Sequence, residues 1–220
     1  MGFGPGKLKY AAGMDEARKV RDFWFGKLPL APDDLTKRMR LWFGYDITPE
    51  QQQRWDDVIR AQFEPLVKRA IEGELVMWAD GPRRRMSLIL LLDQFPRNIY
   101  RGFARAFAGD EQAQALALSG MNSGADAALD PIERMFFYMP LQHSETLDVQ
   151  DEAVAAYRRL HMEAPDALKE TFASTLDYAK RHRAVVAQFG RFPHRNRLLG
   201  RPSTPDEIAY MRTGGEDFSR

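Results

Sequence analysis

One short phrase occurs twice in the sequence, and both copies carry residue types that bind anions. Residues 94–98 read QFPRN and residues 190–196 read GRFPHRN. Proline lacks an amide hydrogen and ends helices, so each copy is expected to close a helix and present fixed guanidinium and carboxamide donors. We therefore expect two helix ends to hold one anionic partner. The candidate ligand-binding residues are Arg97, Asn98, Arg101, Arg191, Arg195, Asn196 and Arg201.

The second copy lies within a run of positive charge that extends from Asp177 to Asp206 without an intervening acidic residue. Arginine outnumbers lysine in this run, and its planar guanidinium suits a bidentate grip on carboxylate or phosphate. Two alternatives remain open at this point. The arginines either pair with acids elsewhere in the chain or face water, as charge runs usually do.

His182 is expected to point inward. It falls within an apolar stripe of helical spacing that contains Leu168, Phe172, Ala179 and Val186. An inward histidine is more often a hydrogen-bonded core residue than a base, and both interpretations stay open.

Two further histidines and two acids complete the candidate catalytic set. His194 stands beside Arg195, a cation that lowers its proton affinity, while His143 and Glu145 lie two residues apart. Asp93 ends a very apolar run and needs a partner, which we expect to be a cation of the C-terminal phrase. In this hypothesis His182 or His194 moves a proton, and Asp93 or Glu145 orients the imidazole.

Other kinds of chemistry lack a pattern. The four histidines include no two at the helical spacing of a strong metal site, so we predict no metal. The chain has no cysteine, which excludes disulfides and thiolate chemistry, and no serine stands in a nucleophile-elbow context. No glycine-rich phosphate loop follows a strand, and we predict no cofactor.

Composition favours a cytoplasmic globular protein. Lysine plus arginine number 32 and aspartate plus glutamate 31, so the total charge calls for neither nucleic acid nor an anionic membrane. The longest strongly apolar run, residues 86–92, is far too short to cross a bilayer. The glycine-rich start lacks the features of a secretory signal. We expect a flexible leader over residues 1–13, one helical domain over 14–212 and a flexible tail over 213–220.

Helix-start signals recur, whereas alternating strand patterns are scarce. Thr48, Asp130 and Thr204 each precede a proline and stand three residues before a glutamate or glutamine, which is typical of a capping box. The predicted helices cover residues 14–25, 33–43, 49–72, 82–95, 110–120, 131–139, 148–163, 165–188 and 205–212. We expect Pro65 to bend or divide the helix over 49–72. About nine helices with short connections predict an all-α fold, with antiparallel pairs in a tetratricopeptide-like superhelical stack or a bundle.

Four phrases together resemble a known bacterial family, the domain of unknown function number 924. They are residues 23–26 (FWFG), 92–98 (LDQFPRN), 140–145 (PLQHSE) and 189–196 (FGRFPHRN) with 199–201 (LGR). The resemblance covers residues 16–212. It implies a bacterial, soluble, all-helical protein with a tetratricopeptide-like fold, and it implies no activity, catalytic residue or cofactor.

Three functions remain to be compared. The first is a pocket that binds a small anionic metabolite. If the protein is also an enzyme, a histidine in this pocket serves as a proton shuttle. The second is a helical scaffold that binds a peptide or partner helix in an apolar groove, without a perturbed titratable cluster. Nucleic-acid binding is the least favoured, because no known binding module is present. A protein partner or a homo-oligomer is left open.

Overall fold

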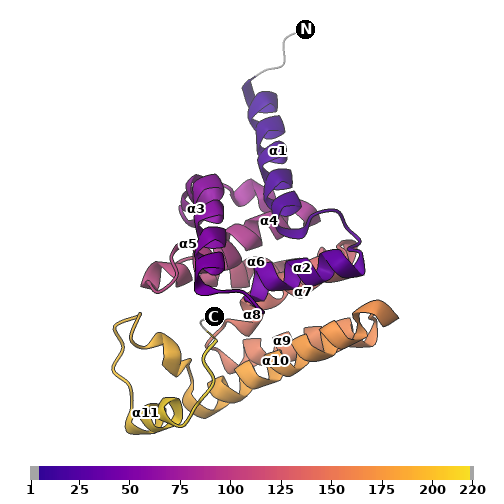
Figure 1. Ribbon diagram of the computed structural model, residues 1–220. Coiled ribbons are helices and arrows are strands. Elements are labelled where there is room, and N and C mark those ends of the chain that lie inside the picture. Colours follow the sequence, from indigo (N-terminus) through magenta and orange to yellow (C-terminus); the bar gives the residue numbers. More distant parts are fainter. Residues whose placement is uncertain (1–4, 219–220) are drawn as a thin grey trace.

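The computed structural model describes residues 5–218, with side chains from residue 15 onward, and this part of the chain is helical without a strand (Figure 1). The α-helices are α1 (Pro5–Phe25), α2 (Pro32–Phe43), α3 (Pro49–Ile71), α4 (Pro82–Ile89), α5 (Phe95–Ile99), α6 (Asp110–Asn122), α7 (Pro131–Phe137), α8 (Met139–Gln142), α9 (Leu147–Met162), α10 (Lys169–Phe189) and α11 (Pro205–Arg212). A π-helical turn, η2 (Leu90–Gln94), joins α4 to α5. The predicted all-α class is confirmed.

The predicted helix starts rest on local hydrogen bonds that the structure contains. In each of three helices the capping side chain accepts a hydrogen bond from a backbone N–H of the first turn. The side chain three residues later accepts a hydrogen bond from the backbone N–H of the capping residue. The pairs are Thr48 with Gln51 at α3, Asp130 with Glu133 at α7 and Thr204 with Glu207 at α11. These boxes satisfy amides that a helix otherwise leaves unpaired, which explains why the starts are readable from sequence.

The start of the first helix and the effect of Pro65 differ from expectation. The first helix begins at Pro5 rather than at residue 14, so the expected leader contributes to α1 from Pro5 onward. Residues 1–4 and 219–220 of the expected leader and tail lie outside the described residues. Pro65 does not divide α3, which runs from Pro49 to Ile71.

The helices form two connected groups in Figure 1. One contains α1 and α3 to α6, and the other is the antiparallel pair of α9 and α10. The short helix α8 packs against both α6 and α9 and so links the groups. The C-terminal chain passes through α11 and returns toward the middle of the molecule. The tetratricopeptide-like superhelical order remains a prediction.

A large apolar core joins the two groups. Phe136 of α7 is fully buried, and its ring lies 4.7 Å from that of Trp42 and 5.5 Å from that of Trp24, centroid to centroid. A smaller cluster of Val185, Val186 and Phe192 holds the C-terminal segment against α10. The core therefore fixes the position of both copies of the repeated phrase.

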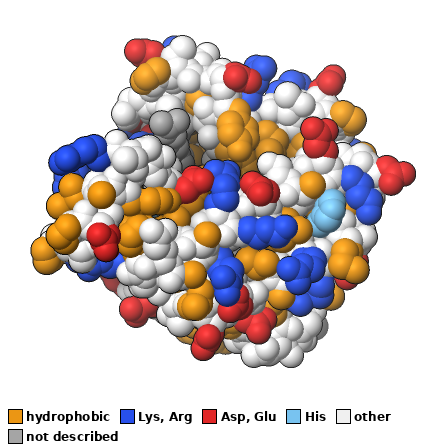
Figure 2. Space-filling model, turned by 90° about the horizontal axis from the view of Figure 1, so that it is seen from below, with side chains coloured by type: hydrophobic (Ala, Val, Ile, Leu, Met, Phe, Trp, Pro, Cys, Tyr) orange, Lys and Arg blue, Asp and Glu red, His pale blue; other side chains and the backbone are white. Residues whose placement is uncertain are grey.

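The arginine run is largely paired with acids from elsewhere in the chain. Arg181 contacts Glu216, and Arg183 contacts Asp151. On the face seen from below, lysine and arginine side chains alternate with acidic ones, and apolar side chains line a hollow among them (Figure 2). This face therefore carries charges of both signs.

Candidate functional site

The first copy of the phrase does not end a helix as expected. In the π turn η2 the amide of Phe95 donates to the carbonyl of Leu90, five residues earlier, and α5 continues from Phe95. Pro96 has no N–H for the usual bond four residues back. The wider turn absorbs this missing bond, so the chain stays helical and carries Asp93 and Arg97 together into the interior. Such turns occur often at functional sites.

The second copy follows the C-terminal end of α10. Gly190 closes the helix with φ 68°, a left-handed conformation that favours glycine. Pro193–Arg195 then form a single 3-10 turn, and this turn places Arg195 in the interior with 6% of its surface exposed. The two copies of the phrase thus meet in space, because Arg97 and Arg195 both contact the carboxylate of Asp110.

Asp93 is fully buried and pairs with two groups. Its Oδ1 lies 2.7 Å from Nδ1 of His143 and 3.2 Å from Nη1 of Arg97, and Gln94 donates to its other oxygen. Burial by itself raises the pKa of Asp93, but Arg97 and His143 outweigh it and hold that pKa below its ordinary range. The expected pairing with a cation of the C-terminal phrase is wrong. Asp93 pairs instead with Arg97, which lies one helical turn away.

Arg195 is only partly satisfied by hydrogen bonds. Its Nη1 donates to the carbonyl of His143 at 3.1 Å and to Asp110 at 3.4 Å, whereas its buried Nε has no partner among the described residues. The guanidinium carbon lies 4.5 Å from the ring centroid of Phe192 and 4.8 Å from that of Phe107. Burial, and then repulsion from Arg97, lower the pKa of Arg195 to about 10.

His143 is held in one orientation by Asp93. Since a carboxylate only accepts, the bond at 2.7 Å assigns the proton to Nδ1 and leaves the lone pair of Nε2 available. Burial, and then the charge of Arg97, lower the pKa of His143 despite Asp93. The imidazole is therefore neutral at pH 7, and the pair has the form of a carboxylate-oriented base.

His182 also points inward, as expected, and is nearly fully buried. Its Nδ1 lies 2.9 Å from the carbonyl of Tyr178, one turn earlier in α10, and its ring stacks on Phe218. Burial, and then the neighbouring His143, keep the pKa of His182 well below its ordinary value. The bond to its own helix matches the core interpretation, yet the ring also faces His143, with their centroids 6.3 Å apart.

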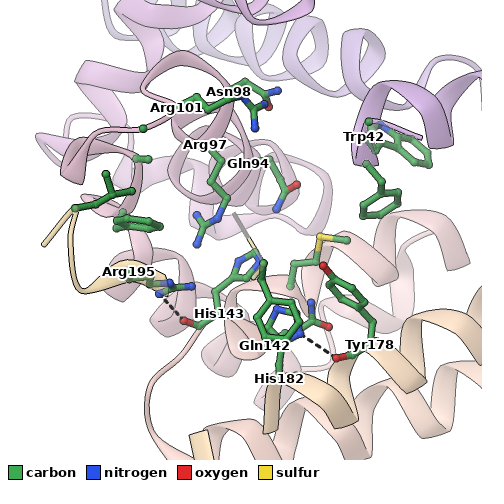
Figure 3. A pocket seen from close by; sticks show the side chains of 18 of the residues that line it. Trp42, Gln94, Arg97, Asn98, Arg101, Gln142, His143, Tyr178, His182 and Arg195 are labelled. Atoms are coloured by element: carbon green, nitrogen blue, oxygen red, sulfur yellow. Dashed lines mark hydrogen bonds between the residues drawn. The ribbon is translucent and has the colours of Figure 1, made fainter. Parts of the chain in front are cut away.

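These side chains surround a pocket of about 110 Å³, which we call the Arg195 pocket (Figure 3). The residues predicted from the sequence that lie on its wall are Arg97, Asn98, Arg101, His143, His182 and Arg195. Drug-sized ligands occupy roughly 300–1,000 Å³, so this space suits a small headgroup. Figure 3 shows His143 between Arg97 and His182, with Arg195 beside it.

Arg101 and Asn98 reach the wall of the pocket with their polar groups already engaged. Arg101 donates to both oxygens of Asp56 at 2.7 and 3.1 Å, and Asn98 donates to one of them at 2.9 Å. Asp56 is 3% exposed and accepts from Gln52 as well. This cluster ties α3 to α5 and gives the pocket a rigid edge.

Four other predicted residues belong to a separate network behind the C-terminal segment. Glu145 accepts two bonds from Arg201 and one from the amide of Phe192, so it does not orient an imidazole. Arg191 and Asn196 both donate to Glu207, which is 2% exposed. The structure does not bring these residues to the pocket. Their bonds fasten residues 190–207 in place.

His194 is also away from the pocket wall. Its Nδ1 is buried without a hydrogen-bond partner among the described residues, and its ring contacts Phe192 and Phe218 edge-on or tilted. Burial, and then the charge of Arg195, lower its pKa to about 4. The expected effect of Arg195 is therefore present, although burial exceeds it.

Sequence reasoning missed several polar residues of this site, Gln52 and Gln94 among them. Asp110 joins the two arginines, while Gln142 and Tyr178 line the pocket. Asp110 carried only a helix-start signal. Gln142 was visible in the phrase at 140–145, directly before His143, but no chemical pattern singled it out.

No group of three histidine, cysteine or acidic side chains between residues 5 and 218 has the arrangement of a metal site. Within the same range no helix has the length and hydropathy needed to cross a membrane.

Comparisons with known proteins place the chain in a family. The model of the family described as "Bacterial protein of unknown function (DUF924)" matches residues 20–215. A solved structure of a protein of unknown function from Agrobacterium tumefaciens is 32% identical, with a TM-score of 0.74, over 91% of this chain and 99% of that one. Among curated proteins none matches. The resemblance read from the repeated phrases is thus confirmed, and the chain belongs to the DUF924 family of bacterial proteins.

Proposed function

We propose that the protein binds a small anionic metabolite, through a carboxylate or phosphate group, in the Arg195 pocket. Arg195 is the anchor, and Arg97 supplies a second positive charge beside it. His143 then lies within the same pocket as a neutral imidazole oriented by Asp93.

The observation that carries this proposal is the unpartnered Nε of Arg195. Leaving a buried donor unsatisfied costs about 1–3 kcal/mol, and native proteins retain few such groups. Arg195 is 6% exposed and uses one of its nitrogens for both of its hydrogen bonds. An oxyanion in the pocket would offset the repulsion from Arg97 and, on reaching the buried Nε, would satisfy this donor.

The balance of charge supports the same site. Asp110 binds Arg97 with two bonds of 2.9 and 3.0 Å but reaches Arg195 only at 3.4 Å. Asp93 pairs with Arg97 and His143 and not with Arg195. Arg195 is therefore the less neutralised of the two arginines, in agreement with its lowered pKa of about 10.

The oriented histidine favours an enzyme over a passive binder. A neutral imidazole that donates a hydrogen bond from Nδ1–H to a buried carboxylate keeps Nε2 as a proton acceptor, and general bases contribute typically 10²–10⁴-fold to a rate. Such a perturbed cluster counts against the peptide scaffold, for which no cluster of this kind is expected. In this proposal His143 takes the proton-shuttle role, with His182 behind it.

Isothermal titration with inorganic phosphate and with acetate tests the anchor. We expect Arg195→Met, which keeps the side-chain length but removes the charge, to weaken binding at least tenfold. The matched control is Arg183→Met, since Arg183 lies on α10 and pairs with the exposed Asp151. Equal anion binding by the wild type and Arg195→Met would overturn the proposal.

A further inference from the structure

The Arg195 pocket opens into a larger groove. The groove has a volume of about 1000 Å³ and shares wall residues with the pocket, among them Phe43, Gln52, Met139 and Tyr178. The pocket alone holds only about 110 Å³. A molecule whose anionic group occupies the pocket therefore has room to extend along the neighbouring groove.

One wall of the groove is apolar. It comes from the end of α2 and the loop that follows, with Met39, Phe43, Tyr45 and Ile47. Tyr45 is 51% exposed there, an unusual state for an aromatic side chain that packs on Phe43 with ring centroids 5.7 Å apart. Exposed apolar surface next to a polar site is a common mark of ligand binding.

The opposite wall is polar, and Glu216 and Asp217 add acidic side chains to the lining. Thr171, Ser174 and Thr175 lie on one face of α10 at the spacing of a helical turn and line the groove with hydroxyl groups. Two arginines also border it, and both are held by carboxylates, Arg101 by Asp56 and Arg181 by Glu216. The groove thus presents no second anion site comparable to Arg195, which favours an uncharged occupant.

We propose that the ligand is an elongated organic anion, with one carboxylate or phosphate head on Arg195 and an uncharged, mainly apolar arm along the groove. This inference rests on the proposed function, because the head fixes where the arm begins. It adds the substrate class: an amphiphilic acid or phosphate ester rather than inorganic phosphate, a compact dicarboxylate or a nucleotide with several charges.

A homologous series of straight-chain monocarboxylates tests the arm. Titrating the full-length protein with acetate, hexanoate and decanoate, below their micelle concentrations, should give an affinity that rises about two- to fourfold per methylene. Octyl phosphate against inorganic phosphate repeats the comparison for the other head. Affinity that is independent of chain length would overturn the inference while leaving the anion site intact.

Two substitutions in the groove separate specific binding from general adhesion of an apolar chain. Ser174→Trp places a large ring in the groove from an exposed position, and Ser174→Ala is its control. Tyr45→Ser removes apolar wall instead. We expect Ser174→Trp and Tyr45→Ser each to weaken decanoate at least fivefold and to leave acetate unchanged, with melting curves showing that both variants fold.

The head is tested with the same ligand. Decanoate should bind Arg195→Met at least tenfold more weakly than the wild type. Equal decanoate binding by Arg195→Met, or unchanged decanoate binding by both groove variants, would overturn the elongated-anion inference. Failure of every member of the series, inorganic phosphate included, to bind the wild type would instead overturn the anion pocket itself.

Discussion

Arg97 and Arg195, one from each copy of the repeated phrase, donate to the same carboxylate, that of Asp110. Two like charges are brought together here, and Asp110 contacts both of them, whereas Asp93 contacts Arg97. Asp110 thus neutralises part of the charge of both arginines. In the proposed function Asp110 therefore sets how much positive charge the bound anion meets.

Asp110→Asn should separate stability from binding. Removing the charge leaves Arg97 and Arg195 without their shared counterion, so the free energy of unfolding should fall by about 2–3 kcal/mol. The same change should tighten phosphate binding at least threefold, because the anion then replaces the lost carboxylate. Urea unfolding and titration measure the two effects.

The control for this variant is Asp177→Asn, since Asp177 is exposed and pairs with Arg181 on the surface of α10. It should change neither quantity appreciably. Weaker phosphate binding by Asp110→Asn would contradict the view that Asp110 and the ligand compete for the same arginines.

Acid should destabilise the protein through His194. Its pKa in the folded protein is about 4, against an ordinary value of 6.5, so the unfolded chain binds the proton more readily. The stability it contributes is complete above pH 6.5 and is lost as pH falls toward 4, with a slope of about 1.4 kcal/mol per pH unit. Urea unfolding at several pH values measures this slope.

His194→Gln removes the titrating group. The slope of the free energy of unfolding against pH between 6.5 and 4 should then decrease by up to about 1.4 kcal/mol per pH unit, which corresponds to one proton. His143 and His182, whose pKa values are lowered too, still contribute to the remaining slope. An identical slope in the two proteins would show that His194 does not stay neutral when the protein folds.

Glu145 should govern the local stability of the C-terminal segment rather than catalysis. Glu145→Gln weakens the paired bonds to Arg201 and the bond from the amide of Phe192. We expect hydrogen exchange to accelerate at residues 190–201 by about tenfold, equivalent to about 1.4 kcal/mol. Glu163→Gln, at an exposed carboxylate that pairs with Arg134, is the control. Unchanged exchange at Phe192 would refute the fastening role.

The parts of the fold that sequence could predict are those that depend on neighbours in the chain. Thr48, Asp130 and Thr204 find their capping partners three residues away, so their helices begin where expected. Pro96 is different. Its effect depends on the buried run before it, which stays helical through a π turn because ending it would expose apolar side chains.

The site was predictable in part for the same reason. The meeting of the two phrases could be inferred from their repetition, but the choice of partners could not. Asp93 binds Arg97 one turn away rather than a distant cation, and Arg191 is taken up by Glu207. Asp110 lies far from Arg195 in sequence, and only tertiary packing brings them together.

Gly109 packs directly against the backbone of the π turn that carries Asp93. A Cβ at Gly109 would lie 2.4 Å from the carbonyl oxygen of Leu92, in the π turn that carries Asp93. The backbone angle of Gly109, φ −102°, is allowed for alanine, so the whole effect of Gly109→Ala is steric. We expect it to lower the free energy of unfolding by on the order of 1–3 kcal/mol.

Because the displaced turn positions Asp93 and Arg97, Gly109→Ala should also weaken phosphate binding, although Gly109 itself does not line the pocket. Gly81→Ala is the matched control, since a Cβ there would come no closer than 3.6 Å to another atom and the backbone angle is again ordinary. Calorimetric melting and phosphate titration of the two variants measure both effects. If Gly109→Ala binds phosphate as the wild type does while losing stability, the π turn supports the core alone, and the orientation of His143 by Asp93 does not depend on it.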